Sequence, residues 1–235
     1  MAKKKEETKK AVVFIVEGNS DKKALEKIFQ KIYQHKDIVF KFMDGDITSD
    51  ENVNKSNVKD IIYNKVDEYR KYKKLFKSDI LEIVHIFDTD GTYIPNEAIV
   101  KGESSHFIYS ESQISCKNVD AVIERNKKKS LMMDYLLGLD NIKGIRYIGY
   151  FMSSNLDHSL YNKQNLSDDL KGEYADAFYE EFQGREKLFI DFLKEEVVNG
   201  VPDVYPASWR YIKEGGHSLE RHTNLHIYFR DNPYQ

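Results

Sequence analysis

Residues 11–21 read AVVFIVEGNSD, and residues 80–92 read ILEIVHIFDTDGT. Each stretch begins with a short run of valine, isoleucine and other apolar residues, which is typical of a strand buried on both faces of a sheet. Each run then leads into carboxylates: Glu17 after the first run, and Asp88 and Asp90 after the second. The two stretches therefore predict two buried strands that carry acidic side chains at their carboxyl ends.

Helical and strand-like patterns alternate around these two stretches. After the first strand, Ser20 and Asp21 offer side-chain oxygens that would cap a helix with one apolar face. This alternation predicts an α/β fold with a mainly parallel central sheet flanked by helices. The predicted strands are 11–16, 37–43, 80–87 and 145–152, and the predicted helices are 22–34, 58–76 and 119–138.

The chain is long enough for one large domain with additions. Residues 1–10 are mostly charged and are expected to form a solvated tail, and residues 11–165 carry the strand and helix alternation. Within that range, residues 92–118 are polar and are expected to be irregular. Residues 166–235 are predicted to be a C-terminal helical and irregular elaboration packed on the same domain, in which TNLHIYF at 223–229 predicts a short strand.

Composition limits the classes of function. The 36 basic and 39 acidic residues give a formal charge of -3, which neither favours nor excludes nucleic acid, because phosphate contacts depend on local potential. The single cysteine, Cys116, excludes a disulfide within this sequence and a cysteine-based zinc site. Since no apolar run approaches the roughly 20 residues that span a bilayer, we expect a cytoplasmic protein without a membrane partner.

The acidic strand ends predict a metal site. Ligands of parallel α/β sheets bind beyond the carboxyl ends of the strands, and Asn155 and Asp157 follow the strand at 145–152. Clustered carboxylates repel one another unless a cation neutralises them. Oxygen ligands favour hard cations, so we expect Mg²⁺ first and Mn²⁺ second. Gly91 permits a positive φ directly after the second aspartate.

FIVEGNSDKKALEKIF followed by IVHIFDTDG resembles a Toprim domain, the metal-binding module of topoisomerases, bacterial primases, ribosomal-RNA maturases and OLD-family nucleases. The resemblance covers roughly residues 11–160 and implies a Rossmann-like fold. It implies that Glu17 is a metal ligand or general acid–base and that Asp88 and Asp90 are metal ligands. Asp21 occupies the place where OLD-like nucleases often carry a second acidic residue.

SSNLDHSLYN, at 153–162, resembles more loosely the Asn-x-x-Phe-Glu segment of Toprim-like phage-defence proteins. This implies that Asn155, Asp157 and His158 complete the site as ligands or proton donors, although His158 also fits a histidine satisfied by its neighbours at a helix start. Together the resemblances imply a Mg²⁺-dependent nuclease that acts on RNA or DNA in phage defence or RNA processing. They also allow for a separate ATPase subunit as an activating partner.

Two other functions stay open. Asp88-Thr89-Asp90-Gly91-Thr92 resembles the first motif of HAD-type phosphatases, in which the first aspartate is a nucleophile, and Ser153 or Ser154 would then belong to the second motif. That interpretation leaves Glu17 without a role. The other alternative is a non-catalytic nucleic-acid-binding module with a degenerate Toprim site.

Two further segments carry candidate residues. A basic run in the predicted third helix is either a solvated face or a phosphate-backbone contact; it holds Arg125, Lys127, Lys128 and Lys129. Near the end of the chain, His222 and His226 would share one face of a strand, which allows for a zinc site with His217. The alternative is that Arg221 and Asn224 hold substrate or support the core, with Trp209 packed beside them.

Overall fold

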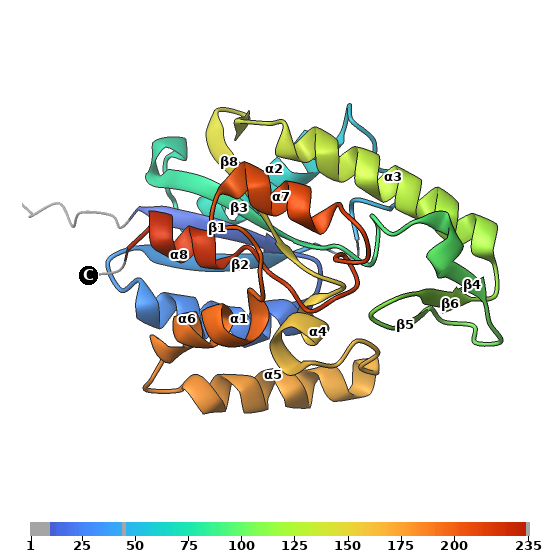
Figure 1. Cartoon of the computed structure of the whole chain (residues 1–235). Coiled ribbons are helices and arrows are strands. Elements are labelled where there is room, and N and C mark those ends of the chain that lie inside the picture. Colours follow the sequence, from blue (N-terminus) through green and yellow to red (C-terminus); the bar gives the residue numbers. More distant parts are fainter. Residues whose placement is uncertain (1–9, 44–45, 234–235) are drawn as a thin grey trace, which may run out of the picture.

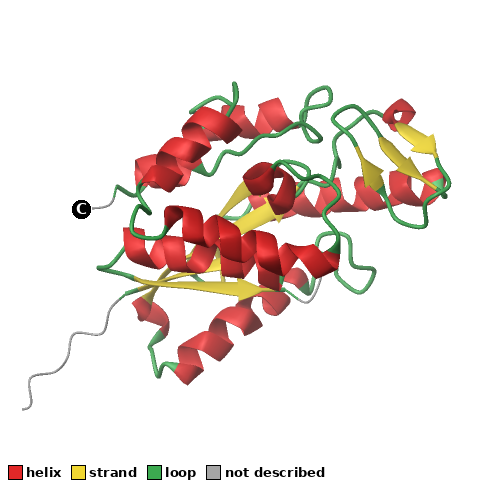
Figure 2. Ribbon diagram, turned by 90° about the horizontal axis from the view of Figure 1, so that it is seen from below, coloured by secondary structure: helices red, strands yellow, loops and turns green. Residues whose placement is uncertain are grey.

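A five-stranded sheet lies at the centre of the computed structural model, which describes residues 10–43 and 46–233 (Figures 1 and 2). Its strand order is β2-β1-β3-β8-β7. The strands are β1 (Ala11–Val16), β2 (Asp37–Phe42), β3 (Ile80–Asp88), β7 (Asn141–Ile142) and β8 (Ile145–Met152). All neighbours are parallel except β7 and β8, which confirms the predicted mainly parallel sheet.

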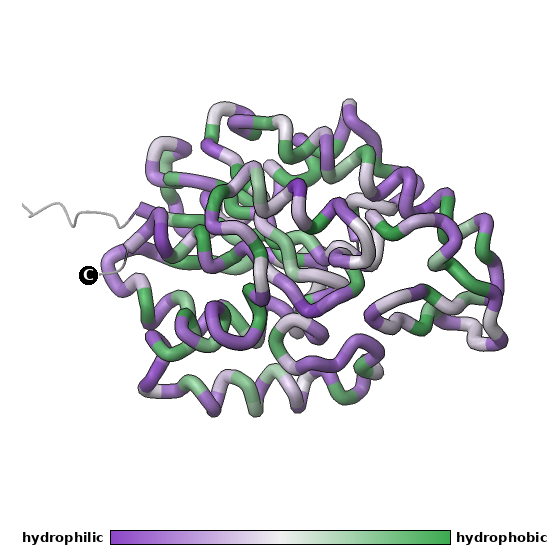
Figure 3. Tube along the Cα trace, in the orientation of Figure 1, coloured by the Kyte–Doolittle hydropathy of each residue, from purple (hydrophilic) through white to green (hydrophobic). Residues whose placement is uncertain are grey.

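Strand β1 shows why the sheet needs cover on both sides, because all six of its residues are buried. Its alternate side chains enter two different apolar clusters, with Phe14 in one and Ile15 in the other. A period of two residues sends neighbouring side chains to opposite faces. In Figure 3 the hydrophobic colour follows the central strands, and the hydrophilic colour is common on the outer turns of the helices.

Helices cover both faces of the sheet (Figure 1). The first face is covered by α1 (Asn19–Ile32), α4 (Leu156–Tyr161), α5 (Asp168–Phe182), α6 (Leu188–Phe192) and α8 (His226–Asp231). The second face is covered by α2 (Val58–Tyr72), α3 (Val119–Leu137) and α7 (Tyr205–Ile212). Shorter helical turns are η1 (Lys77–Asp79), η2 (Asn96–Ala98) and η3 (Leu193–Val197). None of the helices in the described ranges is long and apolar enough to cross a membrane.

The segment 92–118 was expected to be irregular, and this expectation is wrong. It contains a second sheet with the order β4-β6-β5, built from β4 (Ile99–Lys101), β5 (Ile108–Tyr109) and β6 (Ile114–Cys116). Figures 1 and 2 both place this small sheet beside one end of α3 and to one side of the main sheet. It has its own apolar cluster, in which Ile114 packs with Val122 of α3 and with Leu219. Strands this short show too little alternation of apolar and polar residues to be recognised in the sequence.

The predicted strand at 223–229 is also wrong, because α8 begins at His226. Ile227, Tyr228 and Phe229 are all buried in succession, whereas a surface strand would alternate. The Tyr228 ring centroid lies 5.2 Å from that of Phe14 on β1, so the end of the chain packs into the central core. The charged tail predicted for residues 1–10 lies outside the described residues except for Lys10.

Candidate metal centre

The carboxyl ends of three strands open into one cleft of about 290 Å³. Glu17 follows β1, Asp88 ends β3, and Asn155 and Asp157 follow β8. The prediction that these strand ends would converge is therefore confirmed. The acidic residues that line the cleft are Glu17, Asp21, Asp46, Asp88, Asp90 and Asp157.

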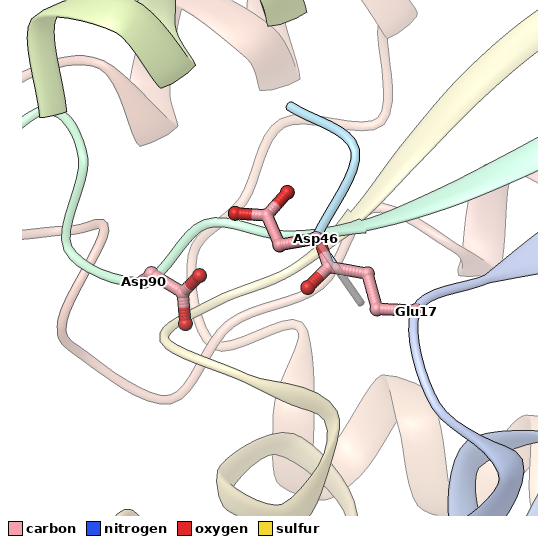
Figure 4. Close-up of side chains that lie close together, drawn as sticks. All are labelled: Glu17, Asp46 and Asp90. Atoms are coloured by element: carbon pink, nitrogen blue, oxygen red, sulfur yellow. The ribbon is translucent and has the colours of Figure 1, made fainter. Parts of the chain in front are cut away.

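The carboxylates that lie closest together belong to two predicted site residues, Glu17 and Asp90, and to Asp46, which was not predicted. Oxygens of Glu17, Asp46 and Asp90 all lie within 4.8 Å of one another. Figure 4 shows the three side chains gathered around one space between the ends of β1 and β3. Asp90 reaches this space because its backbone turns sharply, with φ of 47° at Asp90 and 64° at Gly91. The positive φ expected at Gly91 is confirmed.

A lysine lies among these three carboxylates. The Lys129 Nζ donates to Asp90 Oδ2 at 2.5 Å, to Asp46 Oδ2 at 2.7 Å and to Glu17 Oε1 at 3.4 Å. Its side chain has no exposed surface. The prediction that Lys129 contacts a phosphate backbone from the protein surface is therefore wrong, because the ammonium is enclosed by the protein's own acids.

The electrostatics of the cleft follow from burial. Burial, followed by the charge of Asp46, raises the pKa of Glu17 well above its usual value. Burial, followed by the charge of Glu17, raises the pKa of Asp88 in the same way. For Asp46, burial acts in the same direction but is outweighed by Lys129, so the pKa of Asp46 is lowered. Burial lowers the pKa of Lys129 less than Asp90 and Glu17 raise it, so this lysine stays charged.

Asp88 differs from the other acids because it has no partner. Within residues 10–43 and 46–233, its carboxylate forms no hydrogen bond and no ion pair. Asp21 caps the start of α1, since its Oδ2 accepts a hydrogen bond from the Gly18 amide at 2.9 Å. Gly18 is therefore the N-cap of α1, and the predicted capping role of Ser20 is wrong. Asp88 is thus the carboxylate most available to a cation.

Asp157 also lines the cleft. Burial raises its pKa to about 6, and its Oδ1 has no hydrogen-bond partner among the described residues. The Lys171 ammonium on α5 lies 3.8 Å from its Oδ2. Asn155 accepts the His158 amide at 2.8 Å and so caps α4.

His158 is buried, and its Nδ1 lacks a hydrogen-bond partner within residues 10–43 and 46–233. Burial lowers its pKa to about 4, which keeps the ring neutral at pH 7. The described residues that line the cleft do not include His158. Its predicted role as ligand or proton donor has no support from this placement.

The remaining basic candidates on α3 have different environments. Lys127 is exposed, whereas Lys128 donates to the Asp50 carbonyl at 2.6 Å. Arg125 is partly buried and donates to the Asp90 carbonyl at 2.9 Å. Arg125 therefore supports the loop that carries Asp90, and Lys127 is the member of the run that faces solvent freely.

The three C-terminal histidines do not share a site. His217 contacts the Tyr211 carbonyl, His222 contacts Glu220, and His226 contacts Asp203. Over the described ranges, Glu17, Asp46 and Asp90 are the one group of three histidine, cysteine or acidic residues whose ligand atoms all lie within 4.8 Å of one another, and this group contains no histidine. The zinc site considered at these histidines therefore has no support.

Arg221, Asn224 and Trp209 support the fold. Asn224 accepts the Phe151 amide at 2.8 Å, Arg221 donates to the Ser159 carbonyl at 3.0 Å, and Trp209 packs 5.1 Å from the Phe151 ring. The Ser154 amide also donates to the Ser218 carbonyl at 3.0 Å. The segment before α8 thus holds the end of β8 in place beside the cleft.

Sequence signals existed for the missed residues. Asp46 follows β2, which is also a parallel strand and so ends at the same edge of the sheet. Lys129 falls on the buried stripe of α3, between Val122 and Met133 at helical spacing. A lysine at such a position requires a carboxylate partner inside the protein.

Comparisons with models of known protein families, with curated proteins and with solved structures found no match. The cleft is therefore interpreted from its own geometry. Its donor set consists of carboxylate oxygens, which suit a hard divalent cation. The unpartnered Asp88, beside Glu17 and Asp90, fits such an ion.

Proposed function

We propose that this chain is a Toprim-like nuclease that depends on Mg²⁺ or Mn²⁺ and hydrolyses phosphodiester bonds in RNA or DNA. One observation carries the proposal: six carboxyl groups line one cleft, and among the described residues two ammonium groups, Lys129 and Lys171, contact them. Acidic groups therefore outnumber the cations at this site, and the pKa values of Glu17 and Asp88 are raised by burial, because their charged forms are not compensated. Such a cluster lowers the stability of the folded protein unless cations enter it. A divalent metal ion supplies the positive charge, and a substrate phosphate supplies further oxygen ligands for that ion.

The positions of the acids support a division of the cleft. Lys129 supplies positive charge among Glu17, Asp46 and Asp90. Asp88 has no such partner among the described residues. We therefore assign a divalent ion to Asp88 with Glu17 and Asp90, whose charges act on Asp88, because Lys129 already occupies the space among Glu17, Asp46 and Asp90. Asp21 lines the same cleft from α1. When bound, this ion would neutralise developing charge on a phosphoryl oxygen and lower the pKa of water.

Asp157 has the properties of a proton carrier in this scheme. Its pKa of about 6 lies near neutral pH, and a general acid or base works best when its pKa is close to the working pH. Its Oδ1 has no hydrogen-bond partner among the described residues. We assign the carboxyl group of Asp157, which lines the cleft, to proton exchange with water or with the leaving oxygen.

The test is incubation of the full chain with single-stranded and duplex RNA and DNA, with Mg²⁺, with Mn²⁺ and with EDTA. Cleavage should require the metal. Asp88→Asn and Glu17→Gln should each reduce cleavage by about two orders of magnitude or more while the proteins stay folded. Asp140→Asn is a matched control, because Asp140 is exposed near β7 and lies outside the cleft.

Other outcomes point to the rival functions. A phosphatase of the HAD type would form a phosphoryl-aspartate on Asp88, would be trapped by beryllofluoride and would tolerate Glu17→Gln. A binding module would retard labelled nucleic acid without forming metal-dependent products. Either result would replace the nuclease proposal.

A further inference from the structure

A second groove adjoins the candidate metal centre. It has a volume of about 430 Å³, and Asn155, Asp157 and Lys171 line both this groove and the acidic cleft. The two spaces are therefore neighbours, separated by no more than these side chains. A volume of this size is typical of a small-molecule or single-nucleotide pocket.

One wall of the groove is aromatic and exposed. Phe107 directly precedes β5 and Ile108 is the first residue of that strand; they are 39% and 44% exposed. The Arg125 guanidinium lies 4.9 Å from the Phe107 ring centroid and also donates to the Asp90 carbonyl. Arg125 therefore connects the aromatic wall to the loop that carries one of the acids of the metal centre.

The loop before α5 also lines the groove and is hydrogen-bonded to the strand that carries the aromatic wall. Asn165 accepts the Tyr109 amide and donates to the Tyr109 carbonyl, both at 2.8 Å. This pair of hydrogen bonds ties the loop before α5 to β5. The strand and the loop are thus fixed in the structure without a ligand, which reduces the ordering cost of binding.

We propose that this groove binds one unpaired nucleobase of the strand whose phosphate lies in the acidic cleft. This inference rests on the proposed nuclease function and adds that the substrate is single-stranded at the site of cleavage. An aromatic side chain stacks on the face of a base, and in a duplex both faces are covered by neighbouring base pairs. A base must therefore leave the stack to enter the groove.

Charge supports stacking over phosphate binding as the main contact. Lys171 is the one lysine or arginine among the described residues that line the groove, and it already bonds Asp168 at 2.9 Å. Duplex binding normally depends on many such cations. Lys171 lies where the groove meets the acidic cleft, which suits a single phosphate next to the bound base.

The test is fluorescence anisotropy of the full chain with a labelled 12-nucleotide DNA or RNA of mixed sequence, single-stranded or annealed to its complement. Ca²⁺ is supplied in place of Mg²⁺, and a gel checks that the strand is intact afterwards. The single strand should bind more tightly than the duplex. Phe107→Ala should weaken single-strand binding at least about fivefold, because stacking on one aromatic ring contributes about that much or more.

Two variants make the result specific. Phe107→Trp keeps a ring and should bind within about twofold of the unaltered chain. Phe76→Ala is the matched control, because Phe76 is 77% exposed and precedes β3 at the opposite end of the sheet. Equal binding by Phe107→Ala and the unaltered chain, or equal binding of duplex and single strand, would overturn the proposal.

Failure of this inference is separable from failure of the nuclease proposal. Metal-dependent cleavage that is unaffected by Phe107→Ala leaves the nuclease standing and removes the base site. Phe107-dependent binding without cleavage under Mg²⁺ or Mn²⁺ leaves the base site standing and removes the nuclease. No binding of any strand removes the base site.

Discussion

The ammonium of Lys129 and the carboxylate of Asp90 lie 2.5 Å apart, and the lysine side chain is completely buried. Lys129 comes from the middle of α3, and Asp90 comes from the turn after β3. The pair therefore joins a helix on one face of the sheet to the edge where the acidic side chains gather. A buried ion pair of this kind makes each partner depend on the other.

Replacing Lys129 should destabilise the metal-free protein. Lys129→Met removes the cation and leaves Glu17, Asp46 and Asp90 to repel one another, and loss of one buried partner typically costs about 3–5 kcal/mol. Urea unfolding in EDTA measures this change. Lys128→Met is the matched control, because the hydrogen bond that Lys128 forms within the described part of the chain is to a carbonyl, that of Asp50, and it should shift stability by less than about 1 kcal/mol.

Added Mn²⁺ should restore part of the stability that Lys129→Met loses. The vacated space lies among three carboxylates, so the variant should gain more stability from Mn²⁺ than the unaltered chain gains. Thermal unfolding with and without Mn²⁺ measures the two gains. Equal gains in both proteins would show that Mn²⁺ does not enter the space that Lys129 leaves.

Asp88 should control metal binding. Mn²⁺ at about 100 times its dissociation constant should stabilise the unaltered chain by about 2.7 kcal/mol. Asp88→Asn should lose most of that gain, yet be at least as stable as the unaltered chain in EDTA, because it removes a half-buried carboxylate that has no partner among the described residues. Thermal unfolding measures the stability, and Mn²⁺ electron paramagnetic resonance counts bound ions. An unchanged ion count in Asp88→Asn would contradict the assignment.

Asp157 should make stability depend on pH. Its pKa of about 6 exceeds that of an unfolded aspartate, so the folded chain retains a proton that the unfolded chain has lost between about pH 4 and 6. The contribution of Asp157 to stability is therefore fully present below about pH 4 and falls as pH rises to about 6. Asp157→Asn should gain up to about 3 kcal/mol relative to the unaltered chain across this range.

Urea unfolding at several pH values in EDTA checks this prediction. The lowered pKa of His158 acts in the opposite direction, since a histidine buried in its neutral form loses stability as pH falls. That contribution is present in both proteins and cancels in the difference between them. Parallel pH curves for the two proteins would show that Asp157 does not hold the extra proton.

Gly91 should be intolerant of a side chain. Its φ is +64°, and a Cβ there would lie 2.5 Å from Leu219 Cδ2. Gly91→Ala should cost more than about 1 kcal/mol and should weaken Mn²⁺ binding, because the strain displaces Asp90. In the double variant Gly91→Ala, Leu219→Ala the clash is removed but the backbone strain remains. This variant should therefore recover only the part of the metal affinity that the clash had cost.

The matched control for Gly91 is Gly172 on α5. No atom lies within 4 Å of a Cβ built there, so Gly172→Ala should be neutral or should stabilise the helix by about 0.5–1 kcal/mol. Calorimetry of the three proteins measures these changes. A Gly91→Ala protein as stable as the unaltered chain would contradict the strain argument.

Local patterns predicted the architecture of the main sheet. Continuous apolar runs such as Ala11–Val16 must be buried on both faces, and acidic residues directly after them must then lie at one edge of the sheet. Local patterns did not predict the small sheet or α8. Short strands carry little periodicity, and α8 forms because Tyr228 fits the aromatic core around Phe14, a contact that joins the two ends of the described chain.

The sequence by itself determined that Glu17, Asp88 and Asp90 would meet, because each directly follows or ends a buried strand. Only the tertiary structure decided that Asp46 and Lys129 join them, since both positions depend on where a loop and a helix from elsewhere in the chain pack. Burial in the folded protein also decided which of these carboxylates has a positively charged partner. The position of a side chain in the sequence determines at which end of a strand it lies. Its desolvation and its partners depend on distant segments of the chain that pack around it in the folded protein.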